Sequence, residues 1–138
     1  MNILSKVVLL VDDSQTVRRM IEWVLKPSGF RILHAADGIH ALEVLRAEKV
    51  DLAFVDLNMP RMDGIELIRS VRSDKKLQQL PIILLTTENR NEDREAALQA
   101  GANLFLTKPS SPAMLRSTAE SILGVSASAA TEGRKVQP

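Results

Sequence analysis

Short, uninterrupted apolar runs separated by longer stretches with helical spacing are the feature that most restricts how this chain folds. Three runs are strongly apolar, residues 7–11 (VVLLV), 52–55 (LAFV) and 82–85 (IILL), and residues 31–35 and 104–107 are weaker candidates. A run that is apolar at every position is typical of a parallel strand that helices cover on both faces. The chain is therefore expected to contain five buried strands.

The stretches between these runs predict amphipathic helices, because their apolar residues recur every three or four positions. An alanine-rich helix is expected over about 92–100, and capping or helix-ending residues such as Asp37, Gly101 and Ser111 mark several helix ends. The residues expected to face the core are Val17, Met20, Ile21, Val24 and Leu25, then Ala41, Leu42 and Leu45, then Ile65, Ile68 and Val71, and finally Leu115, Thr118, Ala119 and Ile122. Strands that alternate with helices predict an α/β fold with a doubly wound parallel sheet.

A chain of 138 residues has the size of one domain. We expect this domain to span residues 1–123, and residues 124–138, which have no apolar periodicity, to form a flexible tail. The net charge of +1 favours neither nucleic acid nor a membrane surface as a partner, and the absence of cysteine excludes disulfides and thiolate chemistry. No apolar run approaches the ~20 residues of a membrane span, and the N-terminal segment lacks a secretion pattern, so a cytoplasmic location is expected.

Polar residues of particular kinds follow the predicted strands. Asp12 and Asp13 follow the first strand, Asp56 the third and Thr86 the end of the fourth, while Lys108 follows the fifth. If these strands are neighbours, their polar groups converge on the edge where doubly wound sheets bind ligands. Clustered carboxylates repel one another, and a divalent cation relieves that repulsion. Since the candidate ligands are all oxygen atoms, the hard cation Mg²⁺ is expected, with Mn²⁺ as the alternative.

Each of these residues alone has an ordinary structural explanation, since an aspartate at a strand end is commonly a loop residue or a helix cap. The argument for function is that every polar group of one site stands at the end of a predicted buried strand. An aspartate beside a metal ion, a lysine and a hydroxyl donor is suited to receive a phosphoryl group, whose equatorial oxygens those three groups would hold. The sequence therefore predicts a phosphoryl-accepting site.

Five motifs, in this order, closely resemble the receiver domain of two-component response regulators, especially the single-domain proteins of the CheY type. They are LLVDDSQTVRRM at 9–20, AADGIHAL at 35–42, LAFVDLNMPRMDGIEL at 52–67, PIILLTTE at 81–88 and AGANLFLTKP at 100–109. The resemblance covers about residues 5 to 123. It implies a five-stranded (βα)5, flavodoxin-like fold with strand order 2-1-3-4-5.

The resemblance also implies a role for each site residue. Asp56 would be the phosphoacceptor, which forms an aspartyl phosphate by attack on a phosphohistidine of a sensor histidine kinase or a phosphotransfer protein. Asp13 and Asp56 would bind Mg²⁺ directly, Asp12 through water and Asn58 through its backbone carbonyl. Lys108 would contact the phosphoryl group. The peptide bond between Lys108 and Pro109 would be cis. The chain would thus be a phosphoacceptor switch rather than an enzyme.

Two further residues would transmit the change to a downstream target protein. Thr86 matches the switch hydroxyl, and Phe105 stands where the family keeps an aromatic rotamer switch. The readout surface would be the face made by the helix over 92–100, the strand over 104–107 and the last helix. The protein would act as a monomer or as a phosphorylation-dependent dimer. Chemotaxis members commonly carry tyrosine at the position of Phe105, which has no hydroxyl to offer a partner, so the familiar flagellar-motor role is not implied. An aromatic residue is frequent at the position of Ser110, so packing at the start of the last helix is expected to differ.

Three other residues are open to more than one interpretation. Trp23 lies off the apolar stripe of the first helix, where it either covers an edge of the core or anchors a helix of a kinase or phosphotransfer partner. His34 and His40 are isolated in the sequence, and we expect them to be structural rather than phosphorylated or bound to metal.

The sequence also bears on three alternative functions. The chain could be a receiver module of a larger response regulator or hybrid kinase, although its start methionine and short tail favour a stand-alone protein. A magnesium-dependent phosphohydrolase with an aspartate nucleophile needs a second aspartate two positions later, and Asn58 stands there. A flavodoxin needs a phosphate loop after its first strand, where Asp12 and Asp13 would repel the phosphate.

Overall fold

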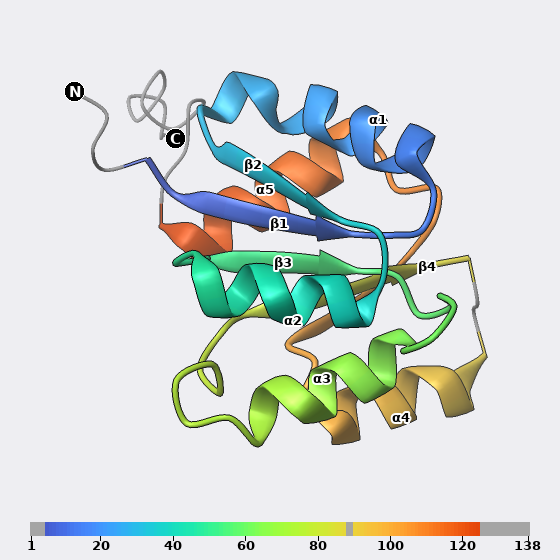
Figure 1. The fold of residues 1–138 in the computed structure, drawn as a ribbon. Helices are drawn as coiled ribbons and strands as arrows, with labels where there is room; N and C mark the ends of the chain where they lie inside the picture. Colours follow the sequence, from blue (N-terminus) through green and yellow to red (C-terminus); the bar gives the residue numbers. More distant parts are fainter. Residues whose placement is uncertain (1–4, 88–89, 125–138) are drawn as a thin grey trace.

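The computed structural model describes residues 5–87 and 90–124, so all of the predicted tail except Gly124 lies outside the described residues. In the described part of the chain, five strands alternate with five helices (Figure 1). These elements are β1 (Val7–Val11), α1 (Gln15–Leu25), the 3₁₀ turn η2 (Lys26–Ser28), β2 (Arg31–Ala35), α2 (Gly38–Ala47), β3 (Leu52–Val55), α3 (Gly64–Arg72), β4 (Ile82–Thr86), α4 (Asn91–Ala100), β5 (Leu104–Thr107) and α5 (Pro112–Leu123). Their order is the one that the sequence predicted.

The five strands form one parallel sheet in the order β2-β1-β3-β4-β5. The register places Val11 opposite Val55 on the neighbouring strand β3, and Leu84 of β4 opposite Phe105 of β5. The chain order reverses between β1 and β3, and sheets of this class bind ligands beyond the carboxyl ends of the strands at such a point. The doubly wound fold with strand order 2-1-3-4-5 is confirmed.

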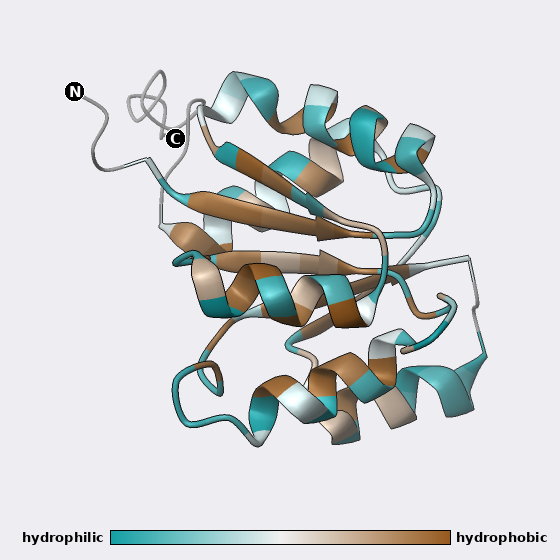
Figure 2. Ribbon diagram, in the orientation of Figure 1, coloured by the Kyte–Doolittle hydropathy of each residue, from teal (hydrophilic) through white to brown (hydrophobic). Residues whose placement is uncertain are grey.

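Successive side chains of each strand point to opposite faces of the sheet, and this alternation builds two hydrophobic cores. On one face, α1 and α5 contribute Leu25 and Leu115, and on the other, α2 and α3 contribute Leu45 and Ile68, with α4 beside them. The two helical layers are visible in Figure 1, and Figure 2 shows strands that are hydrophobic almost throughout between helices that alternate in hydropathy. Both faces are covered, which explains the uninterrupted apolar runs.

Most of the helices begin and end at the capping residues that the sequence indicates. The side chains of Asp37 and Ser111 accept hydrogen bonds from the backbone N–H groups three residues later, at the starts of α2 and α5. Asp63 and Glu66 form a reciprocal capping box at the start of α3. Gly101 ends α4 with a φ of 117°, a conformation that favours glycine. These contacts satisfy backbone groups that the helix itself leaves unpaired.

Two residues predicted to face the core lie on the surface instead. Met20 is 57% exposed. The buried side of α1 contains Ile21, and Met20, one residue earlier, points about 100° away from it around the helix. Ile122 is 37% exposed, because the stripe of α5 that passes through Ala119 continues four residues later at Leu123, which packs against the core. Apolar residues at the edge of a helical stripe therefore produced both errors.

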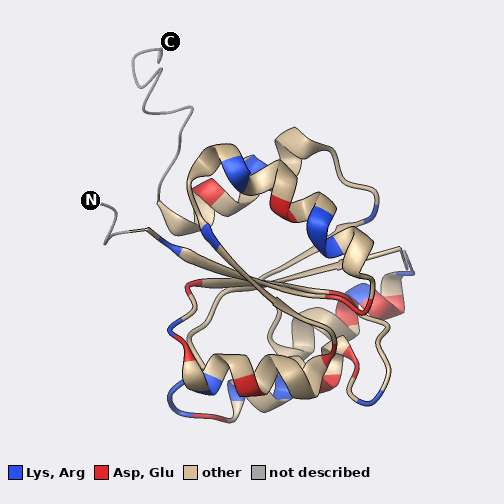
Figure 3. Ribbon diagram, turned by 45° about the horizontal axis from the view of Figure 1, so that its top comes forward, with Lys and Arg blue, Asp and Glu red and all other residues tan. Residues whose placement is uncertain are grey.

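Charged residues are distributed without a dominant sign. Figure 3 shows acidic and basic residues interspersed along the helices, in keeping with the net charge of +1. Within the described residues, no helix combines the length and the apolar character that crossing a bilayer requires.

Candidate functional site

The ends of β1 and β3 place two aspartates side by side. The backbone N–H of Asp56 donates to the carbonyl of Val11 at 2.9 Å, and that of Asp12 donates to the carbonyl of Ala35 at 3.1 Å. The hydrogen-bond ladder of the sheet thus continues one residue past each strand. Because of this continuation, both aspartates leave the sheet from rigid backbone, as a precise site requires.

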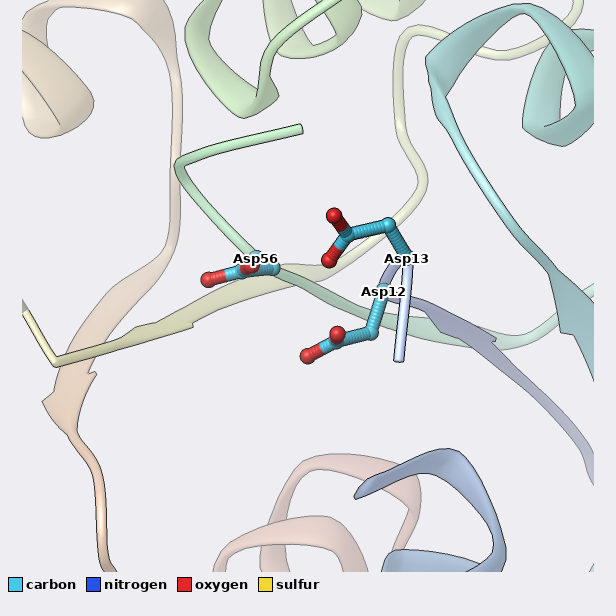
Figure 4. Close-up of side chains that lie close together, drawn as sticks. All are labelled: Asp12, Asp13 and Asp56. Carbon is cyan, nitrogen blue, oxygen red and sulfur yellow. The ribbon is translucent and has the colours of Figure 1, made fainter. Parts of the chain in front are cut away.

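Three carboxylates meet at this edge. One oxygen atom from each of Asp12, Asp13 and Asp56 lies within 4.8 Å of the others (Figure 4). Asp12 is 4% and Asp56 9% exposed, whereas Asp13 is exposed to solvent. The structure therefore brings together the three acidic residues that the sequence singled out.

Lys108 supplies the positive charge of the site. The backbone N–H of Lys108 donates to the carbonyl of Thr86 at 2.8 Å, so the ladder between β4 and β5 fixes its position. Its ammonium nitrogen lies 2.7 Å from Asp12 Oδ2 and 3.5 Å from Asp56 Oδ1. The bond between Lys108 and Pro109 is cis, as expected. One cation thus contacts two of the three carboxylates.

The environment raises the pKa of the Asp56 carboxyl above its ordinary value. Burial is the largest cause, because the charged form loses water. Lys108 opposes the rise, while the negative charges of Asp12 and Asp13 add to it. The ammonium group of Lys108 therefore does not offset the full cost of burying this charge beside two other carboxylates, and a bound cation would lower that cost.

The donor atoms at this edge suit a hard divalent cation. The cluster consists of carboxylate oxygens alone. Mg²⁺ and Mn²⁺ prefer such oxygen ligands, whereas softer metals prefer sulfur or nitrogen. One of the three carboxylates, that of Asp13, is exposed, which leaves room for the water ligands that Mg²⁺ retains. The residues present thus fit the metal that the sequence led us to expect.

The loop between β3 and α3 carries Asn58, whose side chain is exposed. Gly64 closes this loop, since its N–H donates to the carbonyl of Leu57 at 2.9 Å. Arg61, with a φ of 67°, forms an ion pair with the buried carboxylate of Asp37, so the loop is also tied to the start of α2. The sequence identified Asp37 as a cap only, and nothing in the local pattern pointed to Arg61 because the two residues lie on separate segments.

The predicted switch residues lie on β4 and β5. Thr86 is fully buried and opposite Thr107, and Phe105 is 6% exposed two positions earlier on β5. The register and the alternation of side chains place Thr86 and Phe105 on the same face of the sheet, the face that α4 covers. The guanidinium carbon of Arg94 in α4 lies 4.8 Å from the centre of the Phe105 ring, a cation–π contact that the sequence did not reveal.

Trp23 lies on α1 and is 73% exposed. This exposure excludes the interpretation in which Trp23 covers an edge of the core. The ammonium group of Lys26 lies 5.9 Å from its ring. A groove of about 440 Å³ runs beside it, lined by Trp23, Phe30 and Ile32 among others.

His34 and His40 are each engaged in hydrogen bonds, His34 with Glu22 at 2.7 Å and His40 with the backbone N–H of Ala36 at 3.2 Å.

Comparison with known proteins agrees with this arrangement. The sequence model of the response regulator receiver domain matches residues 8–120. A chemotaxis protein CheY homolog from Campylobacter jejuni is 41% identical over 118 residues, which make up 84% of this chain and 91% of that protein. The solved structure of CheY4 from Vibrio cholerae aligns with a TM-score of 0.81 and 35% identity, over 86% of this chain and 99% of that one.

A further solved structure bears on the acidic cluster. It is the receiver domain of a sensor histidine kinase from Pseudomonas aeruginosa, with a magnesium ion coordinated in the active site cleft. It aligns with a TM-score of 0.80 and 33% identity, over 87% of this chain and 98% of that one. The fold, the clustered strand-end residues and these similarities lead to one conclusion: the chain belongs to the response regulator receiver domain family and is a CheY-like member of it.

Proposed function

We propose that this protein is a single-domain response regulator that accepts a phosphoryl group on Asp56 and changes its protein contacts in response. The observation that carries the proposal is the convergence of Asp12, Asp13 and Asp56 within 4.8 Å, with the ammonium group of Lys108 beside two of them. Asp56 is the natural acceptor, because it follows the rigid end of the central strand β3 and lies near both other carboxylates and Lys108.

In the proposed reaction, a carboxylate oxygen of Asp56 attacks the phosphorus of a phosphohistidine on a kinase or phosphotransfer protein. The new bond joins oxygen to phosphorus while the phosphorus–nitrogen bond breaks, and the leaving imidazole keeps the electron pair and takes up a proton. Lys108 turns its ammonium group from the carboxylates to an equatorial phosphoryl oxygen. The hydroxyl of Thr86 donates a hydrogen bond to a second phosphoryl oxygen.

Asp13 and Asp56 would bind Mg²⁺ directly, with Asp12 acting through water and Asn58 through its backbone carbonyl. When bound, Mg²⁺ supplies positive charge against the clustered carboxylates and a contact for the third phosphoryl oxygen. Support comes from the acidic cluster and from the related receiver domain whose structure has magnesium in the same kind of cleft. Mn²⁺ has the same preference for oxygen ligands and is the alternative cation.

The signal passes from Thr86 to the surface formed by α4, β5 and α5. A shift of Thr86 toward the phosphoryl group empties space on the face of the sheet that it shares with Phe105. Phe105 is already turned inward, with Arg94 over its ring, so phosphorylation favours an arrangement that the protein also samples without it. Leu98 and Leu104, which are 47% and 37% exposed, offer apolar contacts to the downstream partner on this surface.

The kinase or phosphotransfer partner docks on α1, with Trp23 as an anchor. An exposed tryptophan next to a groove of about 440 Å³ has the character of an interface hot spot. Replacement of Trp23 by alanine should therefore slow transfer from the partner kinase at least tenfold and leave phosphorylation by acetyl phosphate unchanged, as roughly 1.4 kcal/mol of interface energy implies. Equal rates from the kinase would remove Trp23 from the docking surface.

The proposal is tested by the mass of the intact protein after incubation with acetyl phosphate. We expect one phosphoryl adduct that needs Mg²⁺ and that is absent from the Asp56→Asn variant. Asp63→Asn is the matched control, since asparagine caps a helix as well as aspartate and Asp63 lies outside the cluster. An adduct that persists in Asp56→Asn, or that forms equally without divalent cations, would contradict the proposed roles.

A further inference from the structure

Arg18 connects helix α1 to the backbone of the acidic cluster. Its Nε donates a hydrogen bond to the carbonyl oxygen of Asp12 at 2.9 Å. That carbonyl belongs to the peptide unit that joins Asp12 to Asp13. A planar peptide moves as one body, so a donor that holds its oxygen also restricts the direction in which the Asp13 side chain leaves the chain.

The other end of the Arg18 guanidinium is held by His34 on the neighbouring strand β2. Arg18 Nη1 lies 3.2 Å from His34 Nδ1, and His34 Nε2 lies 2.7 Å from Glu22 Oε1. A guanidinium group only donates hydrogen bonds, so Nδ1 must accept. The ring proton therefore sits on Nε2 and is donated to Glu22, which fixes one tautomer of a neutral His34.

Asp12 and Asp13 differ in how their side chains are held. The carboxylate of Asp12 accepts from the backbone N–H of Ser14 at 2.9 Å and from Lys108 at 2.7 Å. The carboxylate of Asp13 is exposed, and among the residues that the structure describes none donates a hydrogen bond to it. The direction of Asp13 thus depends on its backbone, whose preceding peptide Arg18 holds.

We infer that Arg18, braced by His34 and Glu22, is a positioning residue that aims the Asp13 carboxylate at the divalent cation. This inference rests on the Mg²⁺ site of the proposed function. It adds a residue outside the ligand set that strengthens the binding of Mg²⁺. Arg18 touches neither the cation nor the phosphoryl group. It acts through the Asp12 carbonyl, as outer hydrogen-bond partners do when they orient metal ligands.

The test compares Mg²⁺ binding by isothermal titration calorimetry in the wild type and four variants. Arg18→Met and His34→Phe should each weaken Mg²⁺ affinity roughly tenfold, the range seen when an outer partner of a metal ligand is lost. His34→Gln, whose amide keeps one acceptor and one donor, should recover most of the loss. Arg19→Met is the matched control on the exposed side of α1 and should bind Mg²⁺ as the wild type does.

Two further measurements separate positioning from a general loss of structure. In phosphorylation by acetyl phosphate, Arg18→Met should raise the half-saturating Mg²⁺ concentration while the rate at saturating Mg²⁺ stays within about twofold, because an aimed ligand is recovered by mass action. In the metal-free wild type, the ¹⁵N shifts of His34 should show a protonated Nε2 and an unprotonated Nδ1. This signature does not depend on catalysis.

Wild-type Mg²⁺ affinity in a folded Arg18→Met protein would overturn the inference and leave the proposed function standing. If Arg18→Met does not fold, His34→Phe carries the same test, because it removes the brace without changing α1. A His34 ring protonated on Nδ1 would also overturn the inference. Failure of the wild type to bind Mg²⁺ or to form the adduct would overturn the proposed function, and this inference with it.

Discussion

Replacement of Asp56 by asparagine should stabilise the metal-free protein, because it removes a buried charge from a repulsive cluster. At an effective dielectric constant of 20, two unit charges within 4.8 Å repel by at least ~3.5 kcal/mol, and the Lys108 ammonium 3.5 Å away attracts by ~4.7 kcal/mol. Burial of the Asp56 carboxylate outweighs this attraction, and the negative charges of Asp12 and Asp13 add to the cost of its charge. Water screens the share of the exposed Asp13, so we expect a gain of about 1 kcal/mol in the free energy of unfolding.

The assay is thermal unfolding in EDTA at pH 7.5, where a gain of this size raises the midpoint by about 4 °C. The sign depends on pH. Because the pKa of Asp56 is raised in the folded protein, stability of the wild type falls as pH rises from about 3.9 through that raised pKa. The advantage of Asp56→Asn should therefore be small below that window, grow across it and stay constant above it.

Saturating Mg²⁺ should reverse the order, since the cation stabilises the folded state to which it binds and Asp56→Asn lacks one of its proposed ligands. The control is Asp63→Asn, which removes one charge near the site but outside the cluster and should shift the midpoint little. An Asp56→Asn protein that melts at or below the wild-type temperature in EDTA at pH 7.5 would refute the argument from burial and repulsion.

Three further substitutions test other parts of the structure. Lys108→Ala should destabilise the metal-free protein by about 1.5–3 kcal/mol but retain Mg²⁺ binding by calorimetry, whereas complete loss of binding would place Lys108 among the metal-site residues. Gly64→Ala puts a Cβ 2.5 Å from the carbonyl oxygen of Asp56, so it should cost about 1–3 kcal/mol and slow phosphorylation; an unchanged melting curve would contradict this. Arg72→Met removes hydrogen bonds to four residues and should cost about 2–4 kcal/mol in urea unfolding, whereas exposed Arg69→Met should cost little; equal losses would show the bonds to be unimportant.

Much of the fold could be read from local pattern. A solid apolar run such as residues 82–85 needs cover on both faces, which predicts a buried parallel strand, and Asp37 and Ser111 mark helix starts by their own chemistry. Pattern failed at the edges of helical stripes, where Met20 and Ile122 are apolar yet exposed. The strand order came from resemblance to a family, because hydrogen bonds between strands leave no trace in the order of residues.

The sequence by itself determined which residues form the candidate site. Asp12, Asp13, Asp56 and Lys108 follow directly from their positions at strand ends, because the carboxyl ends of parallel strands meet at one edge. Only the tertiary structure decided how those groups are held and charged. The brace of Arg18 on the Asp12 carbonyl, and the burial that raises the pKa of Asp56, arise where distant segments pack together. Such contacts depend on distances in space, and a one-dimensional pattern does not encode them.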